Sequence, residues 1–325
     1  MSTIPILSFT PLQKELVWGG RKLESILGKT LPSDGPYGES WEVVDLPDNQ
    51  SVVNGGPLHG QSLEALLKGD KPSILGNASL LDGHFPLLAK FIDAEATLSV
   101  QVHPDEAACA RLKAGARPKT EAWYIIDRAP GAKIFAGLKD GVNRSHLKEA
   151  IVAGAVEELL YVVEVNPGDF VYLPAGTIHA IGAGVLLAEI QQSSNTTYRV
   201  FDWNRLGLDG KPRTLHIEQA LEATDYSIVG PPVAASPASG LPGVRSAFFE
   251  MALVTLAPND KITLEGVGPL ILMGVGGPGR ATIHANSSSS TIHNGVTRFV
   301  PAAIASNVSI EAQDSVHVLS TRVPS

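Results

Sequence analysis

Hydrophobic residues along this chain come in short runs that either alternate with polar residues or form brief apolar blocks. Glycine, proline, asparagine and aspartate separate the runs, which include SWEVVDLP, SVVNGG, FPLLAKFID, TEAWYIID, GDFVYLPAG and VLLAEIQQ. Alternation with a period of two, interrupted by turn-forming residues, is typical of strands in a β-barrel or sandwich. The pattern therefore predicts an all-β protein.

Four stretches have helical character instead. Capping residues, apolar positions at helical spacing and terminal glycines predict short helices over 62–70, 104–115, 143–154 and 215–224. Because these stretches are few and short, we expect them to lie at the periphery of the strands.

A shift in composition suggests where the chain divides. Residues 227–243, SIVGPPVAASPASGLPG, are rich in proline, alanine, serine and glycine and carry no charge, so we predict a linker there. The expected domains are a larger one over 1–226, which carries the short helices and the chemistry, and a smaller β-barrel over 244–325 without a metal site. Both can be jelly-roll barrels, although no exact repeat relates them.

The bulk composition narrows the class of protein. The 325 residues are 44% hydrophobic and 18% charged, which is ordinary for a globular protein, and the net charge of −8 argues against nucleic acid or an anionic membrane surface as a partner. The single cysteine cannot form an intrachain disulfide. We see no signal peptide and no apolar run of about 18 residues, so we expect a cytoplasmic protein.

One predicted strand has an unusual polar face. In LSVQVHP, residues 98–104, the apolar residues Leu98, Val100 and Val102 point to one side. Ser99, Gln101 and His103 then share the other side, and Pro104 ends the strand. Packing against a core explains the apolar face. The polar face is not explained by core packing, so we expect it to bind a ligand or take part in catalysis.

Two further segments carry similar residues in strand contexts. Lys119 and Glu121 share one face of KTEAWYII, and His179 follows two turns in NPGDFVYLPAGTIHAIG. Two histidines and a glutamate from different strands can converge inside a barrel, and tetrahedral nitrogen and oxygen ligands suit zinc. Gln101 is two residues from His103 and can reach the same ion. The other seven histidines are expected to be ordinary surface or core residues.

Taken together and in order, these motifs resemble a known family. SVQVHPDE, KTEAWYII, GDFVYLPAGTIHAIG and EIQQSSNTTYRVFDWNR are similar to type I mannose-6-phosphate isomerase, the zinc-dependent phosphomannose isomerase of the cupin superfamily, in its short bacterial form. The likeness extends to VWGGRKLESILGK, GESWEV and FPLLAKFIDA. It covers residues 10–225 well and the C-terminal segment only loosely, and it implies two cupin barrels.

The resemblance implies roles for individual residues. Gln101, His103, Glu121 and His179 match the ligands of one zinc ion per chain. Lys119, Glu189 and Arg199 match active-site residues, and Ser99 stands near the phosphate of the substrate. Two positions depart from longer members of the family, with Asn195 in place of Asp and Ile181 in place of Tyr.

The chemistry of an aldose–ketose isomerase fits these residues. The expected substrate is a small phosphorylated sugar, mannose 6-phosphate or fructose 6-phosphate, whose isomerisation through an enediol requires a base and stabilisation of an oxyanion. Glu189 is the candidate base, with Lys119 as its competitor if burial lowers the pKa of the amine. Arg199 is expected to stabilise the oxyanion and to pair with Glu189. Arg205, Ser99 and Lys90 are candidates for the phosphate.

Two other functions stay open at this level. Another cupin metalloenzyme, such as an iron or manganese oxygenase, would favour an additional histidine in the first motif and would not need Lys119 or Arg199. A non-catalytic sensor of sugar phosphates would be expected to lose a metal ligand or one of Glu189 and Arg199, and all of these are present.

Overall fold

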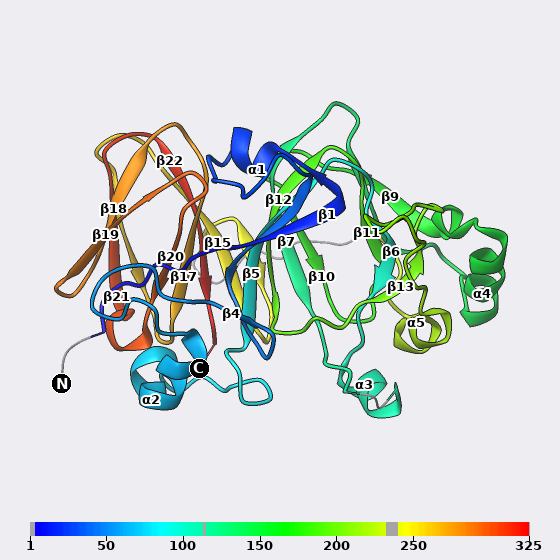
Figure 1. The fold of residues 1–325 in the computed structure, drawn as a ribbon, viewed down its shortest axis with the longest axis horizontal. Helices are drawn as coiled ribbons and strands as arrows, with labels where there is room; N and C mark the ends of the chain where they lie inside the picture. The colour runs from blue at the N-terminus through cyan, green and yellow to red at the C-terminus, as the bar shows by residue number, and fades with distance from the viewer. Residues whose placement is uncertain (1–3, 113–114, 232–239, 325) are drawn as a thin grey trace.

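The computed structural model describes residues 4–112, 115–231 and 240–324. Its strands lie in four principal sheets stacked in layers across the long axis of the molecule, with helices at the periphery (Figure 1). The predicted all-β class is confirmed. The predicted closure of the strands into two barrels is wrong, because each sheet is open and ends in edge strands.

The first two layers contain the segments with the unusual polar residues. Six strands form a sheet in the order β1 (Leu12–Gly20), β2 (Tyr37–Val43), β5 (Leu87–Ala94), β12 (Val185–Gln192), β7 (Glu121–Arg128) and β10 (Phe170–Leu173). Five strands face it in the order β13 (Tyr198–Phe201), β6 (Val100–Val102), β11 (His179–Ile181), β8 (Lys133–Leu138) and β9 (Leu160–Glu164).

The other two layers belong to the C-terminal part of the chain. A five-stranded sheet runs in the order β14 (Gly243–Arg245), β15 (Glu250–Leu256), β22 (Val316–Arg322), β17 (Leu270–Gly276) and β20 (Thr297–Val300). A four-stranded sheet follows in the order β16 (Lys261–Glu265), β21 (Asn307–Ala312), β18 (Arg280–Ala285) and β19 (Ser288–His293). A two-stranded ribbon joins β3 (Asp45–Leu46) to β4 (Asn49–Gln50).

Short helices surround these layers, and the four predicted ones are confirmed. The helices are α1 (Lys22–Ser25), α2 (Leu63–Leu75), α3 (Glu106–Leu112), α4 (Arg144–Ala153) and α5 (Ile217–Ala223), with 3₁₀ turns η1 (Val156–Leu159) and η2 (Ala302–Ile304). Among the described residues, none of them is long and apolar enough to cross a membrane. The end of the predicted helix over 104–115 includes residues 113–114, which lie outside the described part of the chain.

Helix α2 runs further than its sequence pattern predicted. Asp70 leaves the helical conformation, with φ −151° and ψ 68°, and its carboxylate accepts a hydrogen bond from the amide of Ser73 at 3.2 Å. Asp70 thus caps a second helical segment in which Pro72 occupies the first turn, where a proline is tolerated. The helix is kinked rather than ended at this point.

The two faces of β6 divide as the alternation predicted. Val100 and Val102 pack outward in a cluster with α4 and α5, through residues such as Leu147 and Leu221. Ser99, Gln101 and His103 consequently face the six-stranded sheet, whose strands β7 and β12 supply Trp123 and Leu187 to the intervening core. The polar face therefore lies between two sheets.

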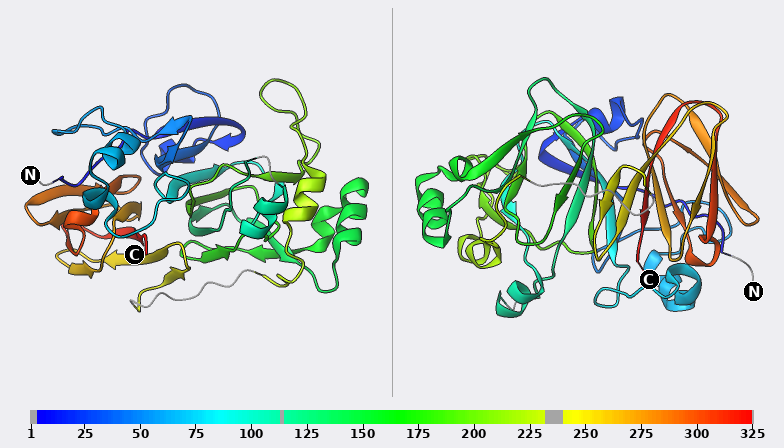
Figure 2. Two further views of the ribbon diagram at one scale, coloured as in Figure 1. Left: turned by 90° about the horizontal axis from the view of Figure 1, so that it is seen from below. Right: turned by 180° about the vertical axis from the view of Figure 1, so that it is seen from behind.

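One of the hydrophobic clusters spans the two halves of the molecule. One cluster contains Phe91 and Leu186 from the six-stranded sheet together with Met251 and Phe299 from the C-terminal sheet. The N-terminal end runs beside the C-terminal half (Figure 2), where Leu7 and Phe299 exchange backbone hydrogen bonds of 2.8 and 2.9 Å. The division into domains over 1–226 and 244–325 stays a prediction, since residues 4–9 pack with the second unit, and residues 232–239 of the predicted linker lie outside the described residues.

Phe299 offers a test of this shared core. Its fully buried ring lies 5.8 Å from the ring of Phe9 and 5.4 Å from that of Phe85. We expect Phe299→Ala to lower the free energy of unfolding, measured in urea, by about 3–5 kcal/mol, because it opens a cavity in the hydrophobic cluster that the two halves share. The exposed Val267→Ala should change it by less than about 0.5 kcal/mol. Two separate transitions, with only the second unit destabilised, would contradict a shared core.

Candidate active site and metal centre

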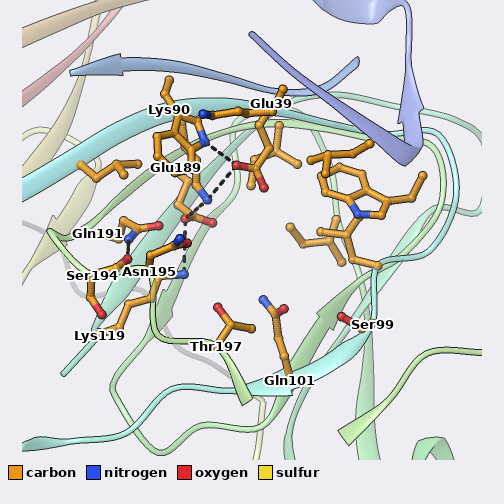
Figure 3. A pocket seen from close by; sticks show the side chains of 18 of the residues that line it. Glu39, Lys90, Ser99, Gln101, Lys119, Glu189, Gln191, Ser194, Asn195 and Thr197 are labelled. Atoms are coloured by element: carbon orange, nitrogen blue, oxygen red, sulfur yellow. Dashed lines mark hydrogen bonds and ion pairs between the residues drawn. The ribbon is translucent and has the colours of Figure 1, made fainter. Parts of the chain in front are cut away.

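A cavity of about 560 Å³ lies between the first two sheets. Its floor is the six-stranded sheet, from which Glu39, Lys90 and Glu189 point inward, and Ser99, Gln101 and Thr197 face them from the opposite side (Figure 3). Both sheets present alternate residues to this space because successive strand residues point to opposite faces. The cavity is therefore polar although its strands are otherwise apolar.

Three of the predicted metal ligands meet next to this cavity, behind Gln101 and Lys119, which line it. His103, Glu121 and His179 are buried, and a ligand atom from each lies within 4.8 Å of the others. The Nε2 atoms of His179 and His103 lie 3.2 and 3.4 Å from the two oxygens of Glu121. Gln101 pairs with His179 across β6 and β11, and its amide reaches Nε2 of His179 at 3.3 Å. The tertiary structure thus brings all four residues together.

The hydrogen bonds around the histidines prepare them to bind a cation. Nδ1 of His103 lies 2.9 Å from the carbonyl of Thr196, and Nδ1 of His179 lies 2.9 Å from the carbonyl of Thr177. A carbonyl only accepts hydrogen bonds, so each Nδ1 carries a proton, and Nε2 is the nitrogen whose lone pair a neutral ring would offer. This arrangement is typical of histidine ligands of metals.

The carboxylate between these rings completes a donor set for a metal. Both oxygens of Glu121 are buried and lack a hydrogen bond of good geometry, although Lys119 and the two histidines lie close to them. Burial alone would raise the pKa of Glu121, but Lys119 and the two histidines hold it well below its usual range, so the group is ionised. Burial, and then the Lys119 ammonium, lower the pKa of His103 to about 3 and keep that ring neutral. Two neutral imidazoles, a carboxylate and an amide fit a divalent cation such as zinc.

Lys119 lies directly beside this donor set. Its Nζ is 2.6 Å from Oε2 of Glu121 and 3.1 Å from Nε2 of His103. Glu189 is more distant, with 3.8 Å between Nζ and Oε1. Lys119 therefore pairs mainly with the expected metal ligands.

Glu189 stands on the floor beside them, on the fully buried strand β12. Its Oε2 accepts a hydrogen bond of 2.9 Å from the indole of Trp123, whereas Oε1 has no hydrogen-bond partner with good geometry. Burial and the nearby Glu121 raise the pKa of Glu189, against the opposing influence of Lys90 and Lys119. A buried carboxylate with a raised pKa, one of whose oxygens is held only by ion pairs with lysines, has the properties of a general base.

Lys90 is held between two carboxylates of the floor. Its Nζ lies 3.1 Å from Oε1 of Glu189 and 3.4 Å from Oε2 of Glu39. Burial alone would lower the pKa of Lys90, but these carboxylates together raise it above its usual range. Since its charge is already shared by two anions, this placement favours a role beside Glu189 over the predicted contact with phosphate.

Arg199 lies on the other side of the cavity, directly opposite Gln101 in the pairing of β13 with β6. Its Nε donates to Oγ of Ser99 at 3.3 Å and its NH1 donates to the carbonyl of Thr214 at 3.0 Å. The predicted pairing of Arg199 with Glu189 is wrong, because the two residues belong to facing sheets and no carboxylate of residues 4–112, 115–231 or 240–324 lies within 4.0 Å of this guanidinium. Burial and the nearby Arg213 lower the pKa of Arg199.

Two further arginines converge on Asp202 next to Arg199. Arg205 donates to Asp202 at 2.9 Å and to the carbonyl of Thr97 at 2.8 Å, and it does not line the cavity. Arg213 lines the cavity and grips both oxygens of Asp202 through Nε and NH2. Burial alone would raise the pKa of Asp202, but the two arginines lower it. Three arginines around one carboxylate leave an excess of positive charge at this end of the cavity.

Glu39 and Arg213 line the cavity but are not among the residues predicted from the sequence. Glu39 shares a face of its strand with Trp41 in GESWEV, so no alternation of polar and apolar residues marks it. Arg213 lies in the loop between β13 and α5, where no periodicity marks it. The departures from the longer relatives, Ile181 and Asn195, both line the cavity.

The chain is similar in sequence to known proteins. Residues 6–123 match the family profile for the catalytic domain of type I phosphomannose isomerase. The chain is 43% identical over 217 residues to a probable mannose-6-phosphate isomerase of Bacillus subtilis, covering 66% of this chain and 67% of that protein. It is 38% identical over 275 residues to a mannose-6-phosphate isomerase of Streptococcus mutans, covering 82% and 84%.

The fold has a counterpart among solved structures. The crystal structure of a mannose 6-phosphate isomerase from Bacillus subtilis superposes with a TM-score of 0.87 at 28% identity, covering 98% of this chain and all of that one. Sequence and structure lead to the same conclusion: the chain belongs to the type I phosphomannose isomerase family.

Proposed function

We propose that this enzyme interconverts mannose 6-phosphate and fructose 6-phosphate through an enediol, with one zinc ion held by Gln101, His103, Glu121 and His179. The observation that carries the proposal is a three-residue donor set next to a cavity that Gln101, Lys119 and the buried carboxylate of Glu189 line. Curated relatives that share 38–43% identity are described as isomerases of this sugar phosphate.

The donor set defines what a metal would contribute. A divalent ion bound by one carboxylate and three neutral groups keeps a formal charge of +1, which polarises and orients oxygens of the sugar. Glu121 supplies that single negative charge, and Lys119 holds one of its oxygens. The two backbone carbonyls at Thr196 and Thr177 keep the histidine rings in the required tautomer.

Proton transfer between C1 and C2 is assigned to Glu189. Trp123 holds Oε2 in place, so Oε1 is the oxygen that would take the proton beside the carbonyl carbon and return it to the neighbouring carbon. A raised pKa makes this carboxylate a stronger base near neutral pH. Lys119 is the weaker candidate, since its ammonium already contacts Glu121 and His103.

The arginines divide the remaining tasks. Arg199 neighbours Gln101 across the strand pair and is placed to stabilise the oxyanion that develops during enolisation. Ser99 and Arg213 stand beside Arg199 and would bind the phosphate, which an arginine can grip with two nitrogens at once. Arg213, rather than Arg205, is therefore our candidate for the phosphate contact in the cavity.

Kinetics of two variants separate these roles. We expect Arg199→Ala to lower kcat by about 10²–10³, because it removes a donor to the developing oxyanion. Arg213→Ala should mainly raise KM, because a contact with the distant phosphate is the same in ground state and transition state. Steady-state kinetics with zinc content measured in each variant provides the test. A fall in kcat for Arg213→Ala with unchanged KM would reverse the assignment.

The proposed reaction itself is tested on the purified protein. A coupled assay should detect fructose 6-phosphate formed from mannose 6-phosphate, and elemental analysis should find one zinc per chain. In D₂O, an enediol route should place solvent deuterium at C1 of the product, because the proton on Glu189 can exchange before it returns. Product without solvent deuterium would favour direct hydride transfer, and absence of turnover would refute the activity.

A further inference from the structure

Charged side chains cross the floor of the cavity in a row of alternating sign. Lys14, Glu39, Lys90 and Glu189 come from the successive strands β1, β2, β5 and β12. Lys14 is the register partner of Glu39, and Lys90 is the register partner of Glu189, so each charge stands beside its opposite. The dashed contacts in Figure 3 connect Glu39, Lys90, Glu189 and Lys119 in one chain.

Lys90 is the central member of this row. It is bound on one side by Glu189 and on the other by Glu39, at 3.1 and 3.4 Å, and its side chain is only 9% exposed. Its single positive charge is shared between the two carboxylates. The strength of its contact with Glu189 consequently depends on how strongly Glu39 holds it.

Glu39 is itself fixed from the other side. The indole nitrogen of Trp41 donates to Oε2, the same oxygen that contacts Lys90. Among the described residues, Glu39 contacts Trp41 and Lys90 rather than an expected metal ligand. It acts on Glu189 through Lys90 and also by direct charge repulsion, and both effects make Glu189 harder to ionise.

We propose that Lys90 and Glu39 are positioning residues for Glu189: Lys90 directs Oε1 of Glu189 into the cavity, and Glu39 limits how far Lys90 neutralises that carboxylate. The inference rests on the proposed role of Glu189 as the base. It gives Lys90 a task that differs from phosphate binding and from proton transfer.

Removing the charge of Lys90 and removing the charge of Glu39 should change the ionisation of Glu189 in opposite directions. The groups that face Glu189 are Lys90 from β5, Trp123 and Glu121 from β7, Lys119 before β7, and Glu39 from β2. Loss of Lys90 removes a cation and makes Glu189 harder to ionise. Loss of the charge on Glu39 releases Lys90 to pair fully with Glu189, which becomes easier to ionise and a weaker base.

The experiment compares zinc-loaded Lys90→Gln, Lys90→Arg and Glu39→Gln with the unmodified enzyme. Asp127→Asn is the matched control, since Asp127 pairs with Lys22 at 2.8 Å on the same sheet but does not line the cavity. The readouts are the acid limb of the kcat profile against pH and an infrared titration of the carboxyl band that disappears in Glu189→Gln. The infrared titration needs no turnover, so it tests this inference even if the proposed activity fails.

We expect the acid limb and the carboxyl titration to move up by about one pH unit in Lys90→Gln and down by a similar amount in Glu39→Gln. Lys90→Arg keeps the cation and should stay close to the unmodified enzyme, as should Asp127→Asn. Zinc content and circular dichroism are measured at each pH. If Lys90→Gln does not fold, Glu39→Gln still tests the inference, because Glu39 is only partly buried and its replacement should move the carboxyl titration of Glu189 down.

Several results would overturn the inference. If the carboxyl titration moved in the same direction in Lys90→Gln and Glu39→Gln, or moved in neither, Glu39 would not act on Glu189 through Lys90. If a higher KM were the sole change in Lys90→Gln, Lys90 would instead bind the phosphate of the substrate. Loss of turnover in Lys90→Arg with an unshifted carboxyl titration would make Lys90 the proton-transferring group.

Discussion

Replacing His179 with alanine is expected to release the metal and abolish isomerisation. The substitution removes one of two imidazoles from the donor set and leaves the Glu121 carboxylate with a single histidine neighbour. Loss of a residue that merely orients a ligand already weakens metal binding by about 10–100-fold, so loss of a ligand should weaken it further. His103→Ala should behave in the same way. Elemental analysis and competition with a zinc chelator measure the effect.

The control for His179→Ala is His146→Ala, which removes an exposed histidine on the surface helix α4. It should retain one zinc per chain and full activity. Stoichiometric zinc together with full activity in either His103→Ala or His179→Ala would show that the ion is bound elsewhere. Thermal unfolding with and without added zinc distinguishes loss of the ion from loss of the fold, because the ion stabilises only a state that binds it.

Glu189→Gln is expected to lower kcat by about 10²–10⁴ while zinc stays bound. Glutamine has the same shape and its oxygen can still accept the hydrogen bond from Trp123, but it cannot take a proton. The variant therefore removes the base and leaves the cavity in place. A Lys119→Gln variant serves as the comparison, since Lys119 is the competing candidate. If Glu189→Gln kept most of its kcat and Lys119→Gln lost it, the base would be Lys119.

The pH dependence of the unmodified enzyme follows from the same carboxylate. Because burial raises the pKa of Glu189 above its ordinary value, the ionised and active form is lost as the pH falls through that raised value. The kcat profile should therefore decline on its acid side at a higher pH than an exposed glutamate would give. Glu189→Gln should lack this limb. Zinc content measured across the range separates protonation of the base from protonation of the ligands.

Local patterns determined much of what was predicted. The alternation in residues 98–104 assigned Gln101 and His103 to one face and the valines to the other, because successive side chains on a strand must point in opposite directions. Capping chemistry located the helices in the same way. Ser62 accepts from the amide of Ala65, and Gly154 adopts a left-handed conformation that few other residues tolerate.

The sequence by itself thus determined the all-β class, the positions of the four predicted helices and the residues that meet around the candidate metal site. Only the tertiary structure decided that the sheets stay open, that residues 4–9 pack with Phe299 of the second unit, and that Arg199 faces Ser99 rather than Glu189. It also brought Glu39 and Arg213 into the cavity. The reason is physical: a period of two specifies which way a side chain points from its own strand, but it carries no information about which distant strand will lie opposite. That partner is chosen by the packing of whole faces, to which residues far apart in the chain contribute together.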